Sequence, residues 1–326
     1  MSEQASTPPR RARLPRVREL ALLCVIAAGV IALQVMSHGA FLTRANLAIV
    51  GLGMSFDAII VVGMTVLLVS GGFDLSVGSV LGLSAAAAAL TARTLGDTGL
   101  APVASLAAGL AVGLAVGLIN GLIVSRVGVN ALIATLATMS MGRGLVAVVT
   151  HGSEVANLPA RFTALGQNSW LGLQSPVWVM AVVVVLGDVL LRKSRFLRRA
   201  YYVGGNEESA RLSGISVANT KLFCFALAAL LAGLAGVLSA ARFASANVST
   251  GAGTELRVIA AAVVGGASLS GGEGTVAGAL LGVLLMQLIT YALNYKGVPP
   301  EWHNLASGAV LLIAATVDII AKRRRA

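Results

Sequence analysis

Acidic and amide side chains interrupt the apolar runs of this chain, and they are the residues most able to do chemistry there. Asp57 lies near the middle of an apolar run and Asp74 lies next to one. A carboxylate at membrane depth is costly, so it pairs with a cation or lines a path for an ion or solute. Amides suit a hydroxylated solute or a neighbouring helix. The candidate path residues are Asp57, Asp74, Asn130, Gln287 and Asn294.

The carboxylates differ in their surroundings. Asp188 and Asp318 lie close to basic segments, Arg192-Lys193 and Lys322 to Arg325, and this proximity favours ion pairs. Asp57 has no such neighbour in sequence, and its position is equally consistent with a lining residue and with a satisfied packing contact. Gln287 and Asn294 are seven residues apart and therefore share one helix face.

The chain lacks the residue patterns of common catalytic and nucleotide-binding sites. Lys193 is the one lysine followed by serine, but Leu191-Arg192 rather than glycine precede it, so no phosphate-binding loop is present. The histidines His38, His151 and His303 are far apart and lack metal-ligand spacing. We therefore expect no enzyme activity, no nucleotide site and no metal or other cofactor bound by this chain.

The longest strongly polar stretch, residues 194–220, predicts a short helix outside the apolar runs. It begins with arginines and turns through Gly204-Gly205. Asn206 is the expected N-cap, two glutamates occupy the first turn, where the helix dipole favours carboxylates, and Gly214 is the expected stop. A small apolar strip on this helix would fit a groove on a partner protein. Its residues are Ala210, Leu212 and Ile215.

Composition identifies the scaffold that holds these residues. The 326 residues are 57% hydrophobic and 11% charged, with a mean hydropathy of +0.87, which is typical of an all-α polytopic membrane protein. The 38 glycines favour closely packed spans. Runs 77–93 and 258–268 are short enough for half-helices. The ten candidate spans are 19–36, 47–70, 77–93, 101–124, 131–150, 175–191, 221–241, 258–268, 275–294 and 303–321.

The basic residues predict the orientation and the domain limits. Five lie in residues 1–18, seven from Arg192 to Lys221 and four from Lys322 to Arg325. This asymmetry places both termini and the 192–220 loop in the cytosol, and it explains the net charge of +11 without nucleic acid. We expect a disordered tail at 1–18 rather than a cleaved signal peptide, one membrane domain at 19–321, and a basic end at 322–326.

Two glycine-rich stretches precede small-residue segments. One is SGGFDLSVGS (70–79) and the other is VGGASLSGGEGT (264–275). Glycine clusters at membrane depth require cover from protein or an aqueous cavity. Two interpretations carry equal weight: a broken helix near a translocation path, and a tight cytosolic turn.

Four ordered motifs resemble the permease subunits of bacterial sugar ABC importers of the ribose, xylose, arabinose and galactose type. They are GGFDLSVGS (71–79), NALIATLATMSMGRGL (130–145), GGNEESARLSGISV (204–217) and VVGGASLSGGEGTVAGALLG (263–282). The resemblance extends over residues 45–320. It implies about ten helices in a type II importer-like fold, in the bacterial inner membrane.

The resemblance also implies partners and a coupling site. Two permeases would work with two cytosolic ATPase subunits and an extracytoplasmic sugar-binding protein, and a monosaccharide would cross by alternating access. Ser209 departs from the alanine that such proteins often carry. The implied coupling helix, which docks on the ATPase, contains Gly205, Asn206, Glu207, Glu208, Ala210, Arg211 and Gly214.

Two other functions remain open from the sequence. A stand-alone, ion-coupled secondary transporter would depend on Asp57. A permease of the same superfamily could instead carry nucleosides, autoinducer-type sugars or branched amino acids. An amino-acid permease would need paired charged contacts in its path, and the sequence reveals none.

Overall fold

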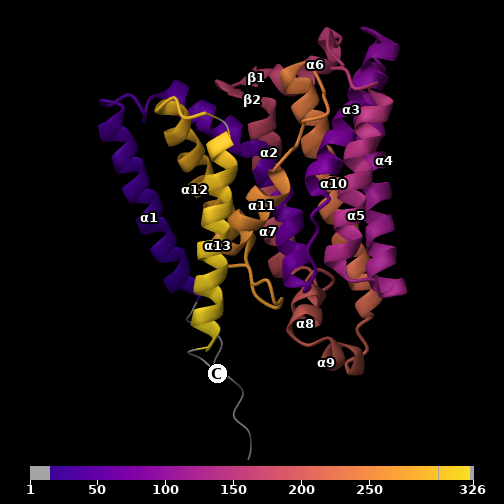
Figure 1. Ribbon diagram of the computed structural model, residues 1–326, viewed down its shortest axis with the longest axis vertical. Coiled ribbons are helices and arrows are strands. Elements are labelled where there is room, and N and C mark those ends of the chain that lie inside the picture. Colours follow the sequence, from indigo (N-terminus) through magenta and orange to yellow (C-terminus); the bar gives the residue numbers. More distant parts are fainter. Residues whose placement is uncertain (1–14, 300, 324–326) are drawn as a thin grey trace, which may run out of the picture.

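The computed structural model describes residues 15–299 and 301–323, and its regular structure is almost entirely helical (Figure 1). The long helices are α1 (Pro15–Met36), α2 (Arg44–Val69), α3 (Val77–Leu95), α4 (Ala101–Leu122), α5 (Ala131–Val149), α7 (Ser175–Lys193), α10 (Val217–Phe243), α12 (Val276–Tyr295) and α13 (Glu301–Arg323). The short elements are the π-helix η1 (Ile123–Val127), α6 (Ala160–Gln167), β1 (Ser169–Trp170), β2 (Leu173–Gln174), α8 (Arg199–Gly205), α9 (Glu207–Leu212) and α11 (Thr254–Val264). The all-α prediction is confirmed.

Eight of the described helices are long and apolar enough to cross a membrane, namely α1 to α5, α7, α10 and α12. The chain is therefore a multi-pass membrane protein. α11 has 11 residues, in line with the half-helix predicted at 258–268. The half-helix interpretation of 77–93 is wrong, because α3 continues to Leu95 and has 19 residues.

α2 is the central helix of the fold. From Ala58 to Val69 every residue is buried, on all sides of the helix. A helix that is apolar around its whole circumference is stable when other helices enclose it. α2 packs against α7, α10 and α12, which are three of the other seven spans, and against α11.

α4 and α10 make the most extensive helix–helix contact, and glycine allows it. Gly109, Gly113, Gly117 and Gly121 recur at every fourth residue of α4, all facing α10. A Cβ atom on Gly113 would lie 2.6 Å from the carbonyl oxygen of Ala229. A Cβ atom at any of the other three positions would be crowded in the same way by backbone or side-chain atoms of α10. Small residues at this spacing let two helix backbones approach closely. The close packing predicted from the glycine content is confirmed here.

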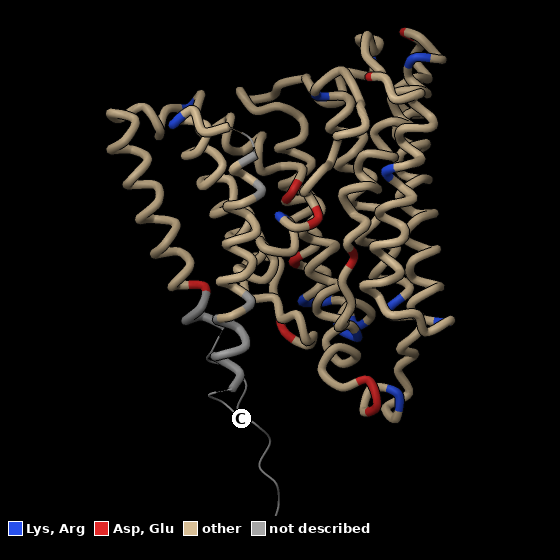
Figure 2. The backbone as a smooth tube through the Cα atoms, viewed as in Figure 1, with Lys and Arg blue, Asp and Glu red and all other residues tan. Residues whose placement is uncertain are grey.

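The molecule has two distinct ends, and α10 connects them. α6 and the β1–β2 hairpin lie at one end, and α8 and α9 lie at the other (Figure 1). α10 has 27 residues, which corresponds to a length of about 40 Å. Most charged positions lie toward the ends, and a few lie within the helical layer (Figure 2).

The first helix begins a few residues before the predicted end of the N-terminal tail. α1 begins at Pro15, so the last four residues of the predicted 1–18 tail are helical. The rest of that tail lies outside the described residues, as do residues 324–326 of the predicted basic end. Residues 1–14, 300 and 324–326 are drawn as a thin grey trace in Figure 1.

Candidate functional site

The helix predicted in the polar stretch is α9. Its N-cap is Asn206, whose side-chain oxygen accepts a hydrogen bond from the Ser209 amide at 2.8 Å. Gly214 has a φ of 78°, the left-handed conformation that ends helices. One detail of the prediction is wrong: Gly204-Gly205 end α8 in helical conformation, and the chain turns at Asn206, where φ is −164°.

The predicted apolar strip on α9 is not one surface. Ala210 is 3% exposed and faces the protein, whereas Leu212 is 82% exposed. With fewer than two turns, α9 has room for one inward face, and the small alanine occupies it. Glu208 and Arg211 are exposed beside Leu212. The solvent-facing surface of α9 is therefore mixed, with one large apolar side chain and charges of both signs.

Two side-chain contacts attach the start of α10 to α9 and to η1. Glu207, in the first turn of α9, forms an ion pair with Lys221. Arg126 of η1 donates a hydrogen bond of 2.8 Å to the Asn219 side chain. Because Asn219 and Lys221 both lie in the first turns of α10, this end of α10 is held by α9 on one side and by η1 on the other.

The two glycine-rich stretches, 70–79 and 264–275, meet each other beside α8. A Cβ atom on Gly271 would lie 2.9 Å from the Cα atoms of both Gly71 and Gly204. Three backbones therefore touch at this point, and a side chain on Gly204 or Gly271 would intervene between them. We call Gly71, Gly204 and Gly271 the glycine junction. Gly71 and Gly271 lie in turns beside α8, whereas Gly78, at the start of α3, contacts Gly251 of the loop after α10. The tight-turn interpretation therefore describes only the part of 70–79 beside α8, and the rest of this stretch runs into the helical layer.

Hydrogen bonds close the glycine junction. The Gly272 amide donates to the Val69 carbonyl at 2.9 Å, and the Tyr201 hydroxyl donates to the Gly274 carbonyl at 2.7 Å. Burial raises the pKa of Tyr201, so its phenol stays protonated as a donor. α8 is thus linked to the end of α2 and to the turn between α11 and α12.

Asp74 lies in the first of these turns and is fully buried. Its carboxylate accepts hydrogen bonds from the Ser76 amide at 2.7 Å and the Ser76 hydroxyl at 2.6 Å, with the Asn120 amide at 3.4 Å. Burial raises the pKa of Asp74, and these hydrogen bonds oppose that shift. The carboxylate caps the turn before α3 and joins it to α4.

Two ion pairs lie within the helical layer, which corrects the expectation that paired charges are absent. Asp57 of α2 contacts Arg257 of α11 at 3.1 Å. Arg143 of α5 lies 3.8 Å from Glu255, also in α11. The partners are far apart in sequence, 200 residues in the first pair, so no local pattern reveals them. α11 is therefore held to α2 and to α5 by opposite charges.

Arg143 also fixes the loop before α11. Its guanidinium donates to the carbonyl oxygens of Thr250 and Gly251 at 2.8 and 2.9 Å. A planar guanidinium can serve several acceptors at once, here two carbonyls, and its charge faces Glu255 at 3.8 Å without a hydrogen bond. Arg143 is thus the main polar contact of the 244–253 loop with α5.

The other predicted residues lie apart from one another. Asn130 caps α5 by accepting a hydrogen bond of 2.9 Å from the Leu132 amide. Gln287 packs against Gly53 of α2, and Asn294 is exposed near the end of α12. The predicted ion pair of Asp188 is confirmed, with Arg192 at 2.9 Å. The side chain of Asp318 lies outside the described residues. Whether any of these residues lines a path remains a prediction.

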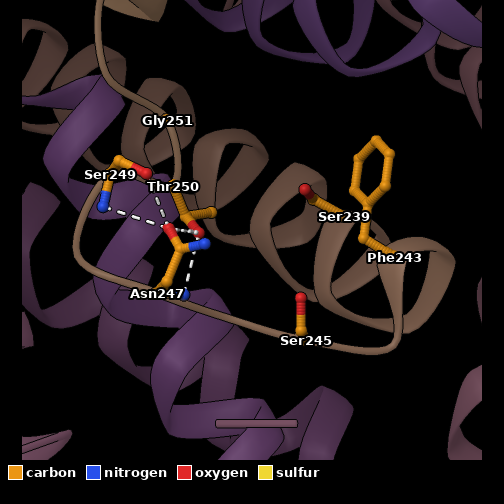
Figure 3. Close-up of a pocket in the computed structure, with 7 residues that line it drawn as sticks. All are labelled: Ser239, Phe243, Ser245, Asn247, Ser249, Thr250 and Gly251. Atoms are coloured by element: carbon orange, nitrogen blue, oxygen red, sulfur yellow. Dashed lines mark hydrogen bonds between the residues drawn. The ribbon is translucent and has the colours of Figure 1, made fainter. Parts of the chain in front are cut away.

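A polar cavity of about 360 Å³ opens where α10 ends, at the α6 end of the molecule (Figure 3). Figure 3 shows two of its residues on the last turns of α10 and the others on the following loop. None was predicted, although the cluster of Ser, Asn and Thr at 245–250 between two apolar runs was the available signal. The cavity is lined by Ser239, Phe243, Ser245, Asn247, Ser249 and Thr250.

Comparison with known proteins places this geometry in a family. A family model described as branched-chain amino acid transport system / permease component matches residues 45–315. The chain is 39% identical to the L-arabinose transport system permease protein of Escherichia coli (strain K12), over 85% of this chain and 84% of that protein. It is 41% identical to the ribose import permease protein of Bacillus subtilis (strain 168), over 81% and 82%.

A further relative is the L-arabinose ABC transporter permease protein of Azospirillum brasilense, which is 36% identical over 87% of this chain and 83% of that protein. The residues matched by the family model contain seven of the eight spans, from α2 onward, together with α9 and the polar cavity. The resemblance drawn from the four motifs is confirmed, and the chain belongs to the ABC-importer permease family that includes these arabinose and ribose permeases.

Proposed function

We propose that this chain is the permease subunit of an ATP-driven importer that moves a monosaccharide across the bacterial cytoplasmic membrane. A separate ATPase binds the nucleotide, an extracytoplasmic protein delivers the sugar, and a second permease, identical or paralogous, completes the path. The names of the relatives support a sugar as the solute. The distribution of Lys and Arg supports a cytosolic α8–α9 end and cytosolic termini.

The observation that carries this proposal is the attachment of α9. Its Glu207 is held by Lys221 of α10, while Glu208, Arg211 and Leu212 are exposed. A short helix that is fixed on one side and exposed on the other suits a contact that receives force. Because Glu207 bonds within the chain, we assign it to holding α9, and we assign Arg211 and Leu212 to docking on the ATPase.

Alternating access then follows from how α8 and α9 are connected. Closure of the ATPase pair would move both short helices. The Glu207–Lys221 ion pair transmits this displacement to α10, and the glycine junction transmits it to α2 and to the turn before α12. Backbones already in contact cannot absorb a displacement by compression, because protein interiors are close-packed. The helices therefore shift as units and open the path to one side at a time.

The test is the ATPase activity of the complete complex reconstituted in liposomes with its binding protein. We expect Leu212→Asp and Arg211→Glu to reduce stimulated ATP hydrolysis about tenfold, the loss of roughly 1.4 kcal/mol of transition-state coupling. Arg44→Ala is the matched control, since Arg44 is exposed at the end of α2 that lies away from α8 and α9. Unchanged stimulation in both docking variants, in a complex that transports sugar, would contradict the proposal.

The secondary-transporter alternative is less well supported. Asp57 pairs with Arg257 and so has the cation partner that an ion-carrying carboxylate would leave free. The amino-acid alternative draws on the description of the family model, and the two ion pairs beside α11 supply the paired charges it requires. Each of these charges lies opposite one of the other sign, although no hydrogen bond from the described residues reaches the Glu255 oxygen that faces Arg143, and the polar cavity is lined by neutral groups. Both features favour an uncharged solute.

A further inference from the structure

We propose that the polar cavity at the end of α10 binds one monosaccharide during transport, with Ser239, Ser245 and Asn247 as hydrogen-bonding groups and Phe243 as the apolar wall. This inference rests on the proposed function and specifies where on the chain the sugar is held. The cavity lies at the end of α10 that is remote from α8 and α9 (Figure 1), which is the side from which a binding protein would release sugar.

The chemistry of the lining suits an uncharged polyol. Its side chains are hydroxyls, one amide and one aromatic ring, and none carries a charge. A charged solute would leave its charge without a partner in such a site, at a high desolvation cost. Hydroxyl and amide groups both donate and accept hydrogen bonds, as sugar hydroxyls do.

Ser239 and Ser245 leave their hydroxyl groups available. Helical Ser and Thr usually bond to a carbonyl one turn earlier, as Thr135 does to Ala131 at 2.8 Å. Within the described part of the chain, the hydroxyl of Ser239 on α10 makes no such bond, although Ser239 is only 8% exposed. The hydroxyl of Ser245, in the loop after α10, makes no hydrogen bond to a described residue either. A nearly buried hydroxyl that faces a cavity without a partner is stabilised by a polar ligand or by water.

Asn247 is oriented by the loop so that one half of its amide is free. Its side-chain oxygen accepts from the Ser249 amide and hydroxyl at 3.1 and 2.8 Å and from the Thr250 hydroxyl at 3.1 Å (Figure 3). These three bonds fix the rotamer of Asn247. The amino group makes no hydrogen bond within the described residues, so it is a preorganised donor next to the cavity.

Phe243 supplies an apolar face beside these groups. Its ring is 63% exposed and lies 6.1 Å, centroid to centroid, from the ring of Phe56 in α2. Small-molecule sites combine aromatic walls with a few placed polar groups, in volumes of roughly 300–1,000 Å³. At about 360 Å³, this cavity is at the lower end of that range and fits a single sugar ring.

The cavity walls are connected to the coupling end. Ser239 and Phe243 belong to α10, whose other end carries the ion pair with α9. Thr250 is held to α5 through the carbonyl contact with Arg143. A displacement of α10 relative to α5 would therefore separate the two sides of the cavity, which gives a means of releasing the sugar.

Cysteine protection tests the proposal. The two native cysteines, Cys24 and Cys224, are replaced by serine and alanine, and Ser245→Cys is introduced into the full complex in membrane vesicles. D-ribose, D-xylose, L-arabinose and D-galactose are added singly at high concentration before a membrane-impermeant maleimide. We expect at least one sugar to slow labelling about threefold or more, and L-leucine to leave it unchanged. Ser153→Cys, exposed in the 150–159 loop, is the control that no sugar should protect.

Two results would overturn the proposal: equal labelling of Ser245→Cys with and without all four sugars, or protection by L-leucine alone. Failure of the proposed function is distinguishable, because the wild-type complex would then lack ATPase activity stimulated by the binding protein. A second pair of variants removes one buried hydroxyl each. Ser239→Ala should reduce uptake about three- to tenfold, whereas Ser105→Ala, on α4 outside the cavity, should not. Equal uptake by these two variants would also count against the cavity.

Discussion

The α4–α10 interface and the surroundings of α11 are built by opposite physical means. α4 contains no charged residue, and its glycines bring its backbone against that of α10. α11, with 11 residues, is held by Asp57 and Arg143 through two ion pairs. The first region depends on many short van der Waals contacts, and the second depends on a few directional ones.

This difference indicates which part of the molecule can change shape. Contacts between small residues are lost together if one helix slides, because each depends on the same close approach. An ion pair with partly exposed partners can exchange one polar partner for another at lower cost. We therefore expect α3, α4 and α10 to move as one body during transport, and α11 with the 244–253 loop to rearrange against it.

The largest effect should come from a side chain inserted between α4 and α10. Gly113→Leu places its Cβ 2.6 Å from the Ala229 carbonyl oxygen and 3.1 Å from the Cα atom of Gly233, both in the α10 backbone. Overpacking typically costs about 1–3 kcal/mol, and backbone that cannot move raises this cost. We expect loss of the monodisperse protein in size-exclusion chromatography. Gly144→Leu is the control, since no atom lies within 4 Å of its Cβ; equal behaviour of the two variants would contradict the comparison.

The next effect tests the ion pair on the other side of the comparison. Asp57→Asn leaves Arg257 with an unneutralised charge, and such losses cost about 3–5 kcal/mol for fully buried pairs. The side chains here are 17% and 29% exposed, so we expect a smaller loss in thermal stability. The double variant Asp57→Asn/Arg257→Gln should be more stable than Asp57→Asn alone. If Asp57→Asn instead abolishes uptake at unchanged stability, the carboxylate acts in transport directly.

A smaller effect is expected at α9, a third region that is attached by polar contacts. Glu207→Gln weakens its contact with Lys221, and half-exposed ion pairs contribute about 0.2–1 kcal/mol to stability. The stability of the folded protein should therefore be nearly unchanged. The ratio of ATP hydrolysed to sugar transported should rise about three- to tenfold, because α9 no longer moves α10. The charge swap Glu207→Lys/Lys221→Glu should restore coupling; a swap that behaves like the single variant would show that the ion pair has no mechanical role.

The smallest effect concerns Asp74, the charged exception on the close-packed side. Its folded-state pKa is raised, so the folded protein loses stability as the pH rises from the ordinary aspartate value of 3.8 toward that raised value. Asp74→Asn keeps an oxygen acceptor for Ser76 and lacks this dependence. Unfolding midpoints measured between about pH 4 and about pH 9 should show wild type falling relative to the variant as the pH rises. Parallel curves would contradict this.

The sequence by itself determined the scaffold and the short helix α9, because both depend on local information. Apolar runs of sufficient length predict spans whatever their neighbours are, and α1 to α5, α7, α10 and α12 follow them. A capped helix is likewise encoded within a few residues, so Asn206, the two glutamates and Gly214 predicted α9 correctly. The motifs that mark the family are also contiguous.

Tertiary structure alone decided which residues meet. The partner of Asp57 is 200 residues away, and the glycine junction joins three turns that only helix packing brings together. The direction in which Ala210 and Leu212 point depends on the neighbours of α9, so the predicted strip was divided. The cavity at the end of α10 is formed by a loop whose shape depends on Arg143 of another helix. Periodicity records which residues share a face, but it does not record what that face contacts.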